Sequence, residues 1–380
     1  MLVKRCGKHF TRITSGLEDN MEFKDIDLVD SDGHIIESIA ELAEFGDASV
    51  KNVALDRKSI RATVWPSLDG VHVHNNTRLE ANNKKNRQHA SEARPGSAED
   101  WQGLLNKSGM NHTVLYPSLG LSHGVIRDIE YVTSLSRAFN DYVAEKYAKI
   151  DSRLHPVALI PMQEPEAGAA ELRRAVKELG LIGSMIPAAG LPMKSDLGHP
   201  LHWPIYKAAE ELDCVLAFHG ASNSGLGLDT FMVPGSSQTL HHPLALIIAC
   251  TSMIYNGVFE QFPNLRVAFL EGGCAWLVLL LDRMERNQEA FGVFHDWPIL
   301  RYLQEGRIMI GCEGNDPSLP YLVERVGAIP FAYSSDYPHE VDYPSAMHEV
   351  EETLQSNLLD DEAKRAILGD NARRFYKLPK

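Results

Sequence analysis

The stretch HPVALIPMQEPEAGAAELRRAVKELGLIGSMIPA, residues 155–188, decides the fold class of this 380-residue chain. It begins and ends with the apolar runs 155–163 and 180–188. These runs lack polar alternation, as expected for strands buried on both faces of a parallel sheet. Between them, residues 170–180 carry apolar side chains at helical spacing and end in Gly180, a residue suited to closing a helix. The stretch therefore predicts a strand, a helix and a second, parallel strand.

The same alternation continues along the chain in both directions. Further apolar runs of this kind are 26–34, 113–118, 214–221, 266–273, 307–315 and 330–339. Helix-like stretches lie between them, at 131–149, 244–262 and 274–291. Strands that are each followed by a helical segment, eight in all, predict an α/β fold of the (β/α)8 TIM-barrel type. A doubly wound sheet would use fewer strands and usually an early glycine-rich phosphate turn, which the sequence lacks.

Two segments fall outside the alternation. Residues 1–25 are polar and aperiodic and are predicted to form an N-terminal arm. Residues 56–100 are rich in asparagine and poor in apolar side chains, and they are too long for an ordinary loop. We expect them to be an insertion, either flexible or folded as a flap over the barrel mouth. The barrel domain is accordingly predicted to span 26–380.

The totals exclude several classes of function. A net charge of −14 gives no basic footprint for nucleic acid. No stretch reaches the roughly 18 consecutive apolar residues of a membrane helix, and no apolar segment of the signal-peptide kind follows the basic start. The five cysteines form no Cys-x-x-Cys pair, which argues against a disulfide framework or a thiolate zinc site. We expect a cytoplasmic protein that binds neither nucleic acid nor membrane.

Side chains able to bind a metal follow the ends of several predicted strands. Catalytic groups of such barrels sit at the carboxyl ends of the strands, because the loops there build one shared pocket. Those positions hold imidazoles and carboxylates, namely Asp32, His34, His219, Glu271, Glu313, Asp336 and His339. Asp32 and His34 are two residues apart, so in an extended strand both point to the same face. This convergence favours a divalent metal over the plainer alternatives, a helix cap for Asp32 and a core position for His219.

Three further residues are candidates for substrate contact. His74 ends a His-x-His pair that begins at His72, but no buried apolar strand precedes the pair, so we assign it to the flap. His242 begins the helix before the sixth predicted strand, and Tyr116 lies near the end of the second. For His242 the alternative is a role in starting that helix.

Several stretches resemble the amidohydrolase-2 family, in the branch that includes the aminocarboxymuconate-semialdehyde decarboxylases. The resemblance rests on VDSDGHIIE, residues 155–183, AFHG, GVFEQFPNLRVAFLEGG, SSDYPH and GDNARRFYKL. It runs from residue 26 to the C-terminus and leaves out part of the expected flap. It implies a distorted βα barrel, a homodimer or a higher homo-oligomer, and a divalent metal. The implied metal ligands are Asp32, His34, His219 and Asp336.

The sequence departs from the family pattern at two of these places. Asp32 stands where His or Glu is more common, and Glu271 stands where the family's decarboxylases carry a histidine for proton transfer or water activation. That second departure argues against decarboxylation. We expect instead hydrolysis of a small organic substrate by a metal-activated water. Asp336 would accept the proton, and Glu271 or His339 would protonate the leaving group.

Other assignments stay open at this point. Glu271 is also a candidate metal ligand, or a carboxylate that orients one. Zinc suits hydrolysis, but the surplus of carboxylates, with Glu37 and Glu313, also suits iron or manganese. A dinuclear site of that kind would make the chain an oxygenase that hydroxylates carbon or nitrogen. A non-catalytic subunit is disfavoured because all four implied ligand positions hold residues able to bind.

Overall fold

The computed structural model describes residues 26–55, 64–65, 93–189, 196–220, 225–228, 231, 234–291, 298–314, 316–339 and 341–380. The predicted arm 1–25, the candidate His74 and most of the expected flap 56–100 lie outside these residues. The proposed domain boundaries therefore stay predictions.

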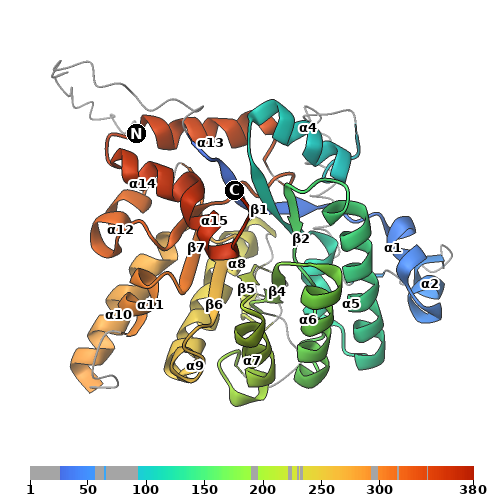
Figure 1. Cartoon of the computed structure of the whole chain (residues 1–380). Coiled ribbons are helices and arrows are strands. Elements are labelled where there is room, and N and C mark those ends of the chain that lie inside the picture. The colour runs from blue at the N-terminus through green and yellow to red at the C-terminus, as the bar shows by residue number, and fades with distance from the viewer. Residues whose placement is uncertain are drawn as a thin grey trace, which may run out of the picture.

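Every predicted strand region overlaps an observed strand. The strands are β1 (Val29–Ile35), β2 (His112–Pro117), β3 (Leu154–Pro156), β4 (Gly183–Pro187), β5 (Val215–His219), β6 (Arg266–Leu270), β7 (Ile308–Cys312) and β8 (Phe331–Tyr333). Neighbours pair in parallel and in chain order, in one sheet of β1-β2-β3 and another of β4-β5-β6-β7-β8. Figure 1 shows them at the centre of the molecule with helices around them.

Backbone hydrogen bonds join the two sheets into the distorted barrel that the sequence predicts. At the seam between β3 and β4, Ala158 N donates to Gly183 O at 2.8 Å and Met185 N donates to Ala158 O at 3.0 Å. The barrel is distorted because this seam is a single bridge, between Ala158 and Ser184, in place of a full strand pairing.

The other seam closes the barrel between β1 and the segment after β8. Asp336 N donates to Asp32 O at 2.9 Å, and His34 N donates to Tyr337 O at 2.7 Å. These bonds place the last predicted site segment directly beside the first, although about three hundred residues separate them in the chain.

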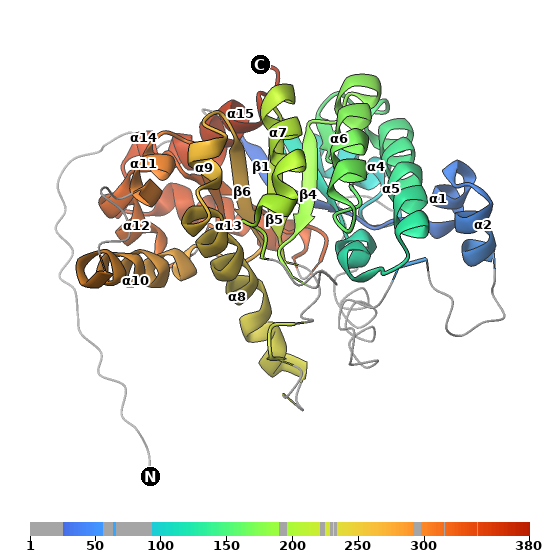
Figure 2. The ribbon, with the colours of Figure 1, turned by 90° about the horizontal axis from the view of Figure 1, so that it is seen from below.

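Helices follow the strands and cover the outside of the barrel. The first half contains α1 (Ile39–Phe45), α2 (Ala48–Leu55), α4 (Ala98–Ser108), η2 (Leu119–Val125), α5 (Ile129–Val143), η3 (Ala144–Ala148), α6 (Pro165–Leu179), η4 (Pro200–His202) and α7 (Trp203–Leu212). The second half contains α8 (Pro234–Tyr255), α9 (Val258–Gln261), α10 (Ala275–Phe291), α11 (Pro298–Gln304), α12 (Leu319–Val326), α13 (Tyr343–Gln355), α14 (Asp361–Arg365), η6 (Ala366–Asp370) and α15 (Asn371–Tyr376). Figure 2 shows α8 extending outward past its neighbours α7 and α9.

Local sequence explains the ends of the predicted helix in 170–180. Helix α6 begins with Pro165, whose fixed φ suits the first turn, and ends before Gly180, which has φ 74°. Its buried residues, among them Leu172 and Ala175, face the barrel. None of the described helices combines the length and the apolar character that crossing a bilayer demands.

Candidate active site

The carboxyl end of β1 carries Asp32 and His34, and a bulge shapes it. The pairing of β1 with β2 shifts its register between Asp30 and Gly33. A β-carbon on Gly33 would lie 2.5 Å from Cη2 of Trp101, so only glycine lets this indole pack against the strand. Trp101 in turn donates from Nε1 to the backbone oxygen of His34 at 2.9 Å. The local sequence Asp-Gly-His therefore fixes the strand end that holds both candidate ligands.

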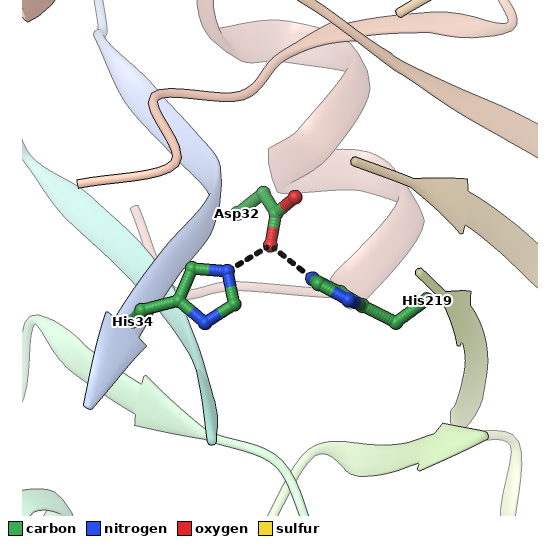
Figure 3. A group of neighbouring side chains, drawn as sticks. All are labelled: Asp32, His34 and His219. Carbon is green, nitrogen blue, oxygen red and sulfur yellow. Dashed lines mark hydrogen bonds and ion pairs between the residues drawn. The ribbon is translucent and has the colours of Figure 1, made fainter. Parts of the chain in front are cut away.

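Asp32, His34 and His219 meet at the barrel mouth, as Figure 3 shows. Nε2 of His34 lies 3.5 Å from Oδ1 of Asp32, and Nε2 of His219, the last residue of β5, lies 3.2 Å from the same oxygen. All three residues are fully buried. Atoms that share one ion at 2.0–2.2 Å lie about 3.0–3.5 Å apart, so these separations fit a bound cation. The predicted convergence of β1 and β5 is present.

Asp336 and His339 complete a second group around His34. Oδ1 of Asp336 lies 3.3 Å from Nε2 of His34 and 2.8 Å from Nδ1 of His339. The rings of His34 and His339 have centroids 3.9 Å apart. Asp336 has φ 53°, a left-handed conformation that aspartate tolerates better than most residues. His34 is thus shared by two triads with metal-ligand spacing, Asp32-His34-His219 and His34-Asp336-His339.

Several atoms that face this centre lack hydrogen-bond partners. Nε2 of His34, Oδ2 of Asp32 and Oδ1 of Asp336 are buried and make no hydrogen bond. The outward nitrogens are anchored, because Nδ1 of His34 lies 3.0 Å from the oxygen of Pro117 and Nδ1 of His219 lies 2.8 Å from that of Gly220. An imidazole that donates outward presents a lone pair inward, which is what a metal requires. The residues therefore fit a divalent cation.

Neighbouring charges at this centre outweigh the effect of burial on the pKa values of its residues. Burial raises the pKa of Asp32, yet His219 and His34 outweigh this and hold that pKa below its usual value. Burial lowers the pKa of His219, yet Asp32 and Glu271 outweigh it and raise that pKa well above its usual value. Asp32 and Glu271 thus favour a positive charge at His219. A divalent cation would supply that charge in place of the proton, so binding and protonation compete.

Glu271 follows β6 and lies beside the metal-ligand cluster. Its Oε2 is 3.1 Å from Nδ1 of His219 and 3.1 Å from Nδ1 of His242. It therefore touches the nitrogen of His219 that faces away from Asp32, and neither described triad includes it. Of the sequence alternatives, the geometry favours a carboxylate that orients a ligand over one that binds the ion. Glu271 has φ 59°, an uncommon conformation of the kind found at functional positions.

Glu37 does not join the centre, contrary to the argument from surplus carboxylates. Its carboxylate accepts the backbone N–H groups of Ser118, Leu119 and Gly120 at 3.3, 2.9 and 2.8 Å. The loop after β2 is thereby fixed, and Oγ of Ser118 lies 2.7 Å from Nε2 of His339. This support could not be predicted from the sequence, because a serine in a loop has no distinguishing pattern.

The remaining candidates have mixed outcomes. Tyr116 is fully buried, and its hydroxyl is 2.6 Å from that of Tyr376, while its ring lies 5.4 Å from the ring of His219. Tyr116 therefore packs against the candidate metal ligand His219. It leaves no exposed surface for the predicted substrate contact. Glu313 is exposed at the end of β7. His242 lies at the centre, against Glu271.

A comparison with protein families matches residues 89–378 to the amidohydrolase family. The chain belongs to the amidohydrolase family. A gamma-resorcylate decarboxylase from Polaromonas sp. is 26% identical over 271 residues, which are 67% of this chain and 79% of that protein. A 2-amino-3-carboxymuconate-6-semialdehyde decarboxylase from Dictyostelium discoideum is 27% identical over 256 residues, which are 64% and 67% of the two chains.

Solved structures support the barrel fold. An amidohydrolase from Mycobacterium avium subsp. paratuberculosis superposes with a TM-score of 0.73 at 18% identity, covering 93% of this chain and 98% of the other. A dihydroxybenzoic acid decarboxylase from Polaromonas sp., crystallised with manganese and 2-nitroresorcinol, has a TM-score of 0.63 at 17% identity over 93% and 98%. The predicted distorted (β/α)8 barrel is thus confirmed.

These relatives correct the predicted activity. The sequence argument favoured hydrolysis, kept oxygenation as the alternative and ranked decarboxylation last because Glu271 replaces a histidine. The two sequence relatives named above are decarboxylases, so the predictions of hydrolysis and of oxygenation were wrong. The error lay in treating one strand end as the only source of an imidazole, whereas His242 reaches the same place from α8.

Proposed function

We propose that this protein is a metal-dependent decarboxylase that releases carbon dioxide from a small organic acid without oxidation. The observation that carries the proposal is the buried cluster of Asp32, His34 and His219, whose inward atoms have the spacing of cation ligands and include two, Oδ2 of Asp32 and Nε2 of His34, without a hydrogen bond. The decarboxylase relatives support this reading of the cluster.

Each residue of the cluster has a part in this chemistry. Asp32, His34 and His219 would hold the cation, with Asp336 beside them. When bound, the cation neutralises charge on substrate oxygens and so favours loss of the carboxyl group. Glu271 fixes the ring of His219 from outside. We further propose manganese, because the carboxylates of Asp32 and Asp336 suit it, none of the candidate ligands is a thiolate, and a structural relative holds it.

The proposed substrate is an acid that carries an oxygen substituent next to its carboxyl group. Such a compound can offer two oxygens to one cation, as the hydroxybenzoates named for the relatives can. The test is a panel of hydroxybenzoates and unsaturated dicarboxylic acids, incubated with protein loaded with manganese. We expect carbon dioxide to form from at least one acid while dissolved oxygen stays constant. Hydrolysis products, or oxygen uptake matched to turnover, would contradict the proposal.

A further inference from the structure

An imidazole–carboxylate pair stands next to the metal-ligand cluster without belonging to it. Nδ1 of His242, in α8, lies 3.1 Å from Oε2 of Glu271, and that carboxylate also contacts His219. The side chain of His242 is 15% exposed, whereas those of His34 and His219 are fully buried. His242 is therefore anchored to Glu271 through Nδ1, and it lies at the boundary between the buried cluster and the accessible space.

Two glycines let α8 approach the strand ends this closely. A β-carbon on Gly220, just after β5, would lie 1.7 Å from Nδ1 of His242. A β-carbon on Gly272, just after β6, would lie 2.6 Å from Cδ1 of Leu246, one turn further along α8. Any larger residue at 220 would push the His242 ring away from Glu271. The position of this imidazole is thus built into the ends of two neighbouring strands.

The other imidazoles of the centre direct both nitrogens toward protein groups of the metal-ligand cluster or toward backbone oxygens that anchor them. His339 contacts Asp336 through Nδ1 and Ser118 through Nε2. His34 and His219 anchor Nδ1 on backbone oxygens and turn Nε2 toward Asp32. Within the described residues, Nε2 of His242 makes no hydrogen bond. Among the imidazoles that the structure describes at this centre, it is the ring nitrogen left for a substrate.

We propose that His242, oriented by Glu271, donates the proton that replaces the carboxyl group on the substrate carbon. This inference rests on the proposed decarboxylation. The N–H bond at Nε2 breaks as a C–H bond forms at the carbon that bears the carboxylate. The bond from that carbon to the carboxyl carbon then breaks, its electron pair stays with the substrate and carbon dioxide leaves. His242 recovers its proton from water, so the net change is one carboxylate plus one proton to product plus carbon dioxide, with no oxidant.

The experiment observes the proton-transfer step alone, because it measures hydrogen exchange on the reaction product. The product of a substrate found in the panel is incubated with manganese-loaded protein in D₂O, and NMR follows deuterium entry at the carbon that carried the carboxyl group. His242→Gln should slow this exchange and kcat by about 100-fold or more, the usual contribution of a general acid. KM and manganese content should stay within about twofold of wild type, because His242 binds neither the ion nor the buried ligands. His242→Ala should recover exchange when imidazole is added.

Two further variants test the geometry. Gly220→Ala keeps every titratable group but displaces the ring, so it should also slow exchange by at least about tenfold. His348→Gln, on the exposed face of α13, is the matched control and should exchange like wild type. Exchange by His242→Gln at the wild-type rate, or loss of manganese together with loss of exchange, would overturn the proposed role while decarboxylation stands. Wild-type protein that releases no carbon dioxide from any acid would overturn both proposals.

Discussion

Replacement of Glu37 by glutamine should weaken both the fold and the centre, although Glu37 touches no candidate ligand. Its two carboxylate oxygens accept the N–H groups of Ser118, Leu119 and Gly120. A glutamine offers one oxygen, and its NH₂ group must then face at least one of these donors. A buried N–H left without an acceptor costs about 1–3 kcal/mol. Burial raises the pKa of Glu37, so relief from burying a charge offsets part of this loss. We expect a net loss of about 2 kcal/mol.

Urea unfolding of the metal-free protein measures this loss directly. Glu44→Gln, at an exposed position of α1, is the matched control and should unfold like wild type. Glu37→Gln should also reduce turnover, because the loop that it releases carries Ser118, the partner of His339. The reasoning is refuted if Glu37→Gln and Glu44→Gln have the same unfolding midpoint.

Three further predictions use other parts of the site. Gly33→Ala should lower the unfolding free energy by about 1–3 kcal/mol, because its β-carbon would overlap the ring of Trp101; an unchanged urea midpoint would count against this packing. Asp336→Asn should abolish carbon dioxide release but leave the melting temperature unchanged, since asparagine also adopts a left-handed φ; normal activity would exclude a role for this carboxylate. Burial raises the pKa of Glu349 to about 8, so its ionisation opposes folding increasingly as pH rises from about 4.5 to 8. Glu349→Gln should therefore match wild type in urea near pH 4 and exceed its stability at pH 8.5, and a gap of the same size at both pH values would contradict this.

The fold could be predicted from the sequence because buried parallel strands are continuous apolar runs. The run 155–163 overlaps β3, the run 180–188 contains β4, and the helical spacing of 170–180 covers the second half of α6 and its closing glycine. Boundaries were less accurate. The single helix expected over 244–262 is the end of a longer helix, α8, followed by α9 after a glycine with φ 68°. Apolar periodicity could not locate that break, because buried apolar residues continue at helical spacing across it, from Ile254 in α8 to Val258 in α9.

Site residues could be predicted from the sequence where their position on a strand determines where they lie. Asp32 and His34 lie in the second half of β1 and His219 ends β5, so barrel geometry alone brings them together. Contacts between a side chain and backbone groups far away in the chain leave no comparable pattern in the sequence. The sequence predicted Glu37 as an additional carboxylate of the metal site, because its partners are loop N–H groups more than 80 residues away in the chain. The sequence marked His242 as a candidate for substrate contact but not as the partner of Glu271, since it comes from the interior of α8 and not from a strand end.

Metal stoichiometry tests the central claim most directly. Protein incubated with manganese, freed of unbound ion by gel filtration and analysed for metal should hold about one ion per chain. Asp32→Asn and His219→Asn should lose most of this ion while their circular dichroism stays that of wild type. His348→Gln, far from the cluster on α13, should keep it. Full manganese content in Asp32→Asn and His219→Asn would show that the ion is held elsewhere and would contradict the account.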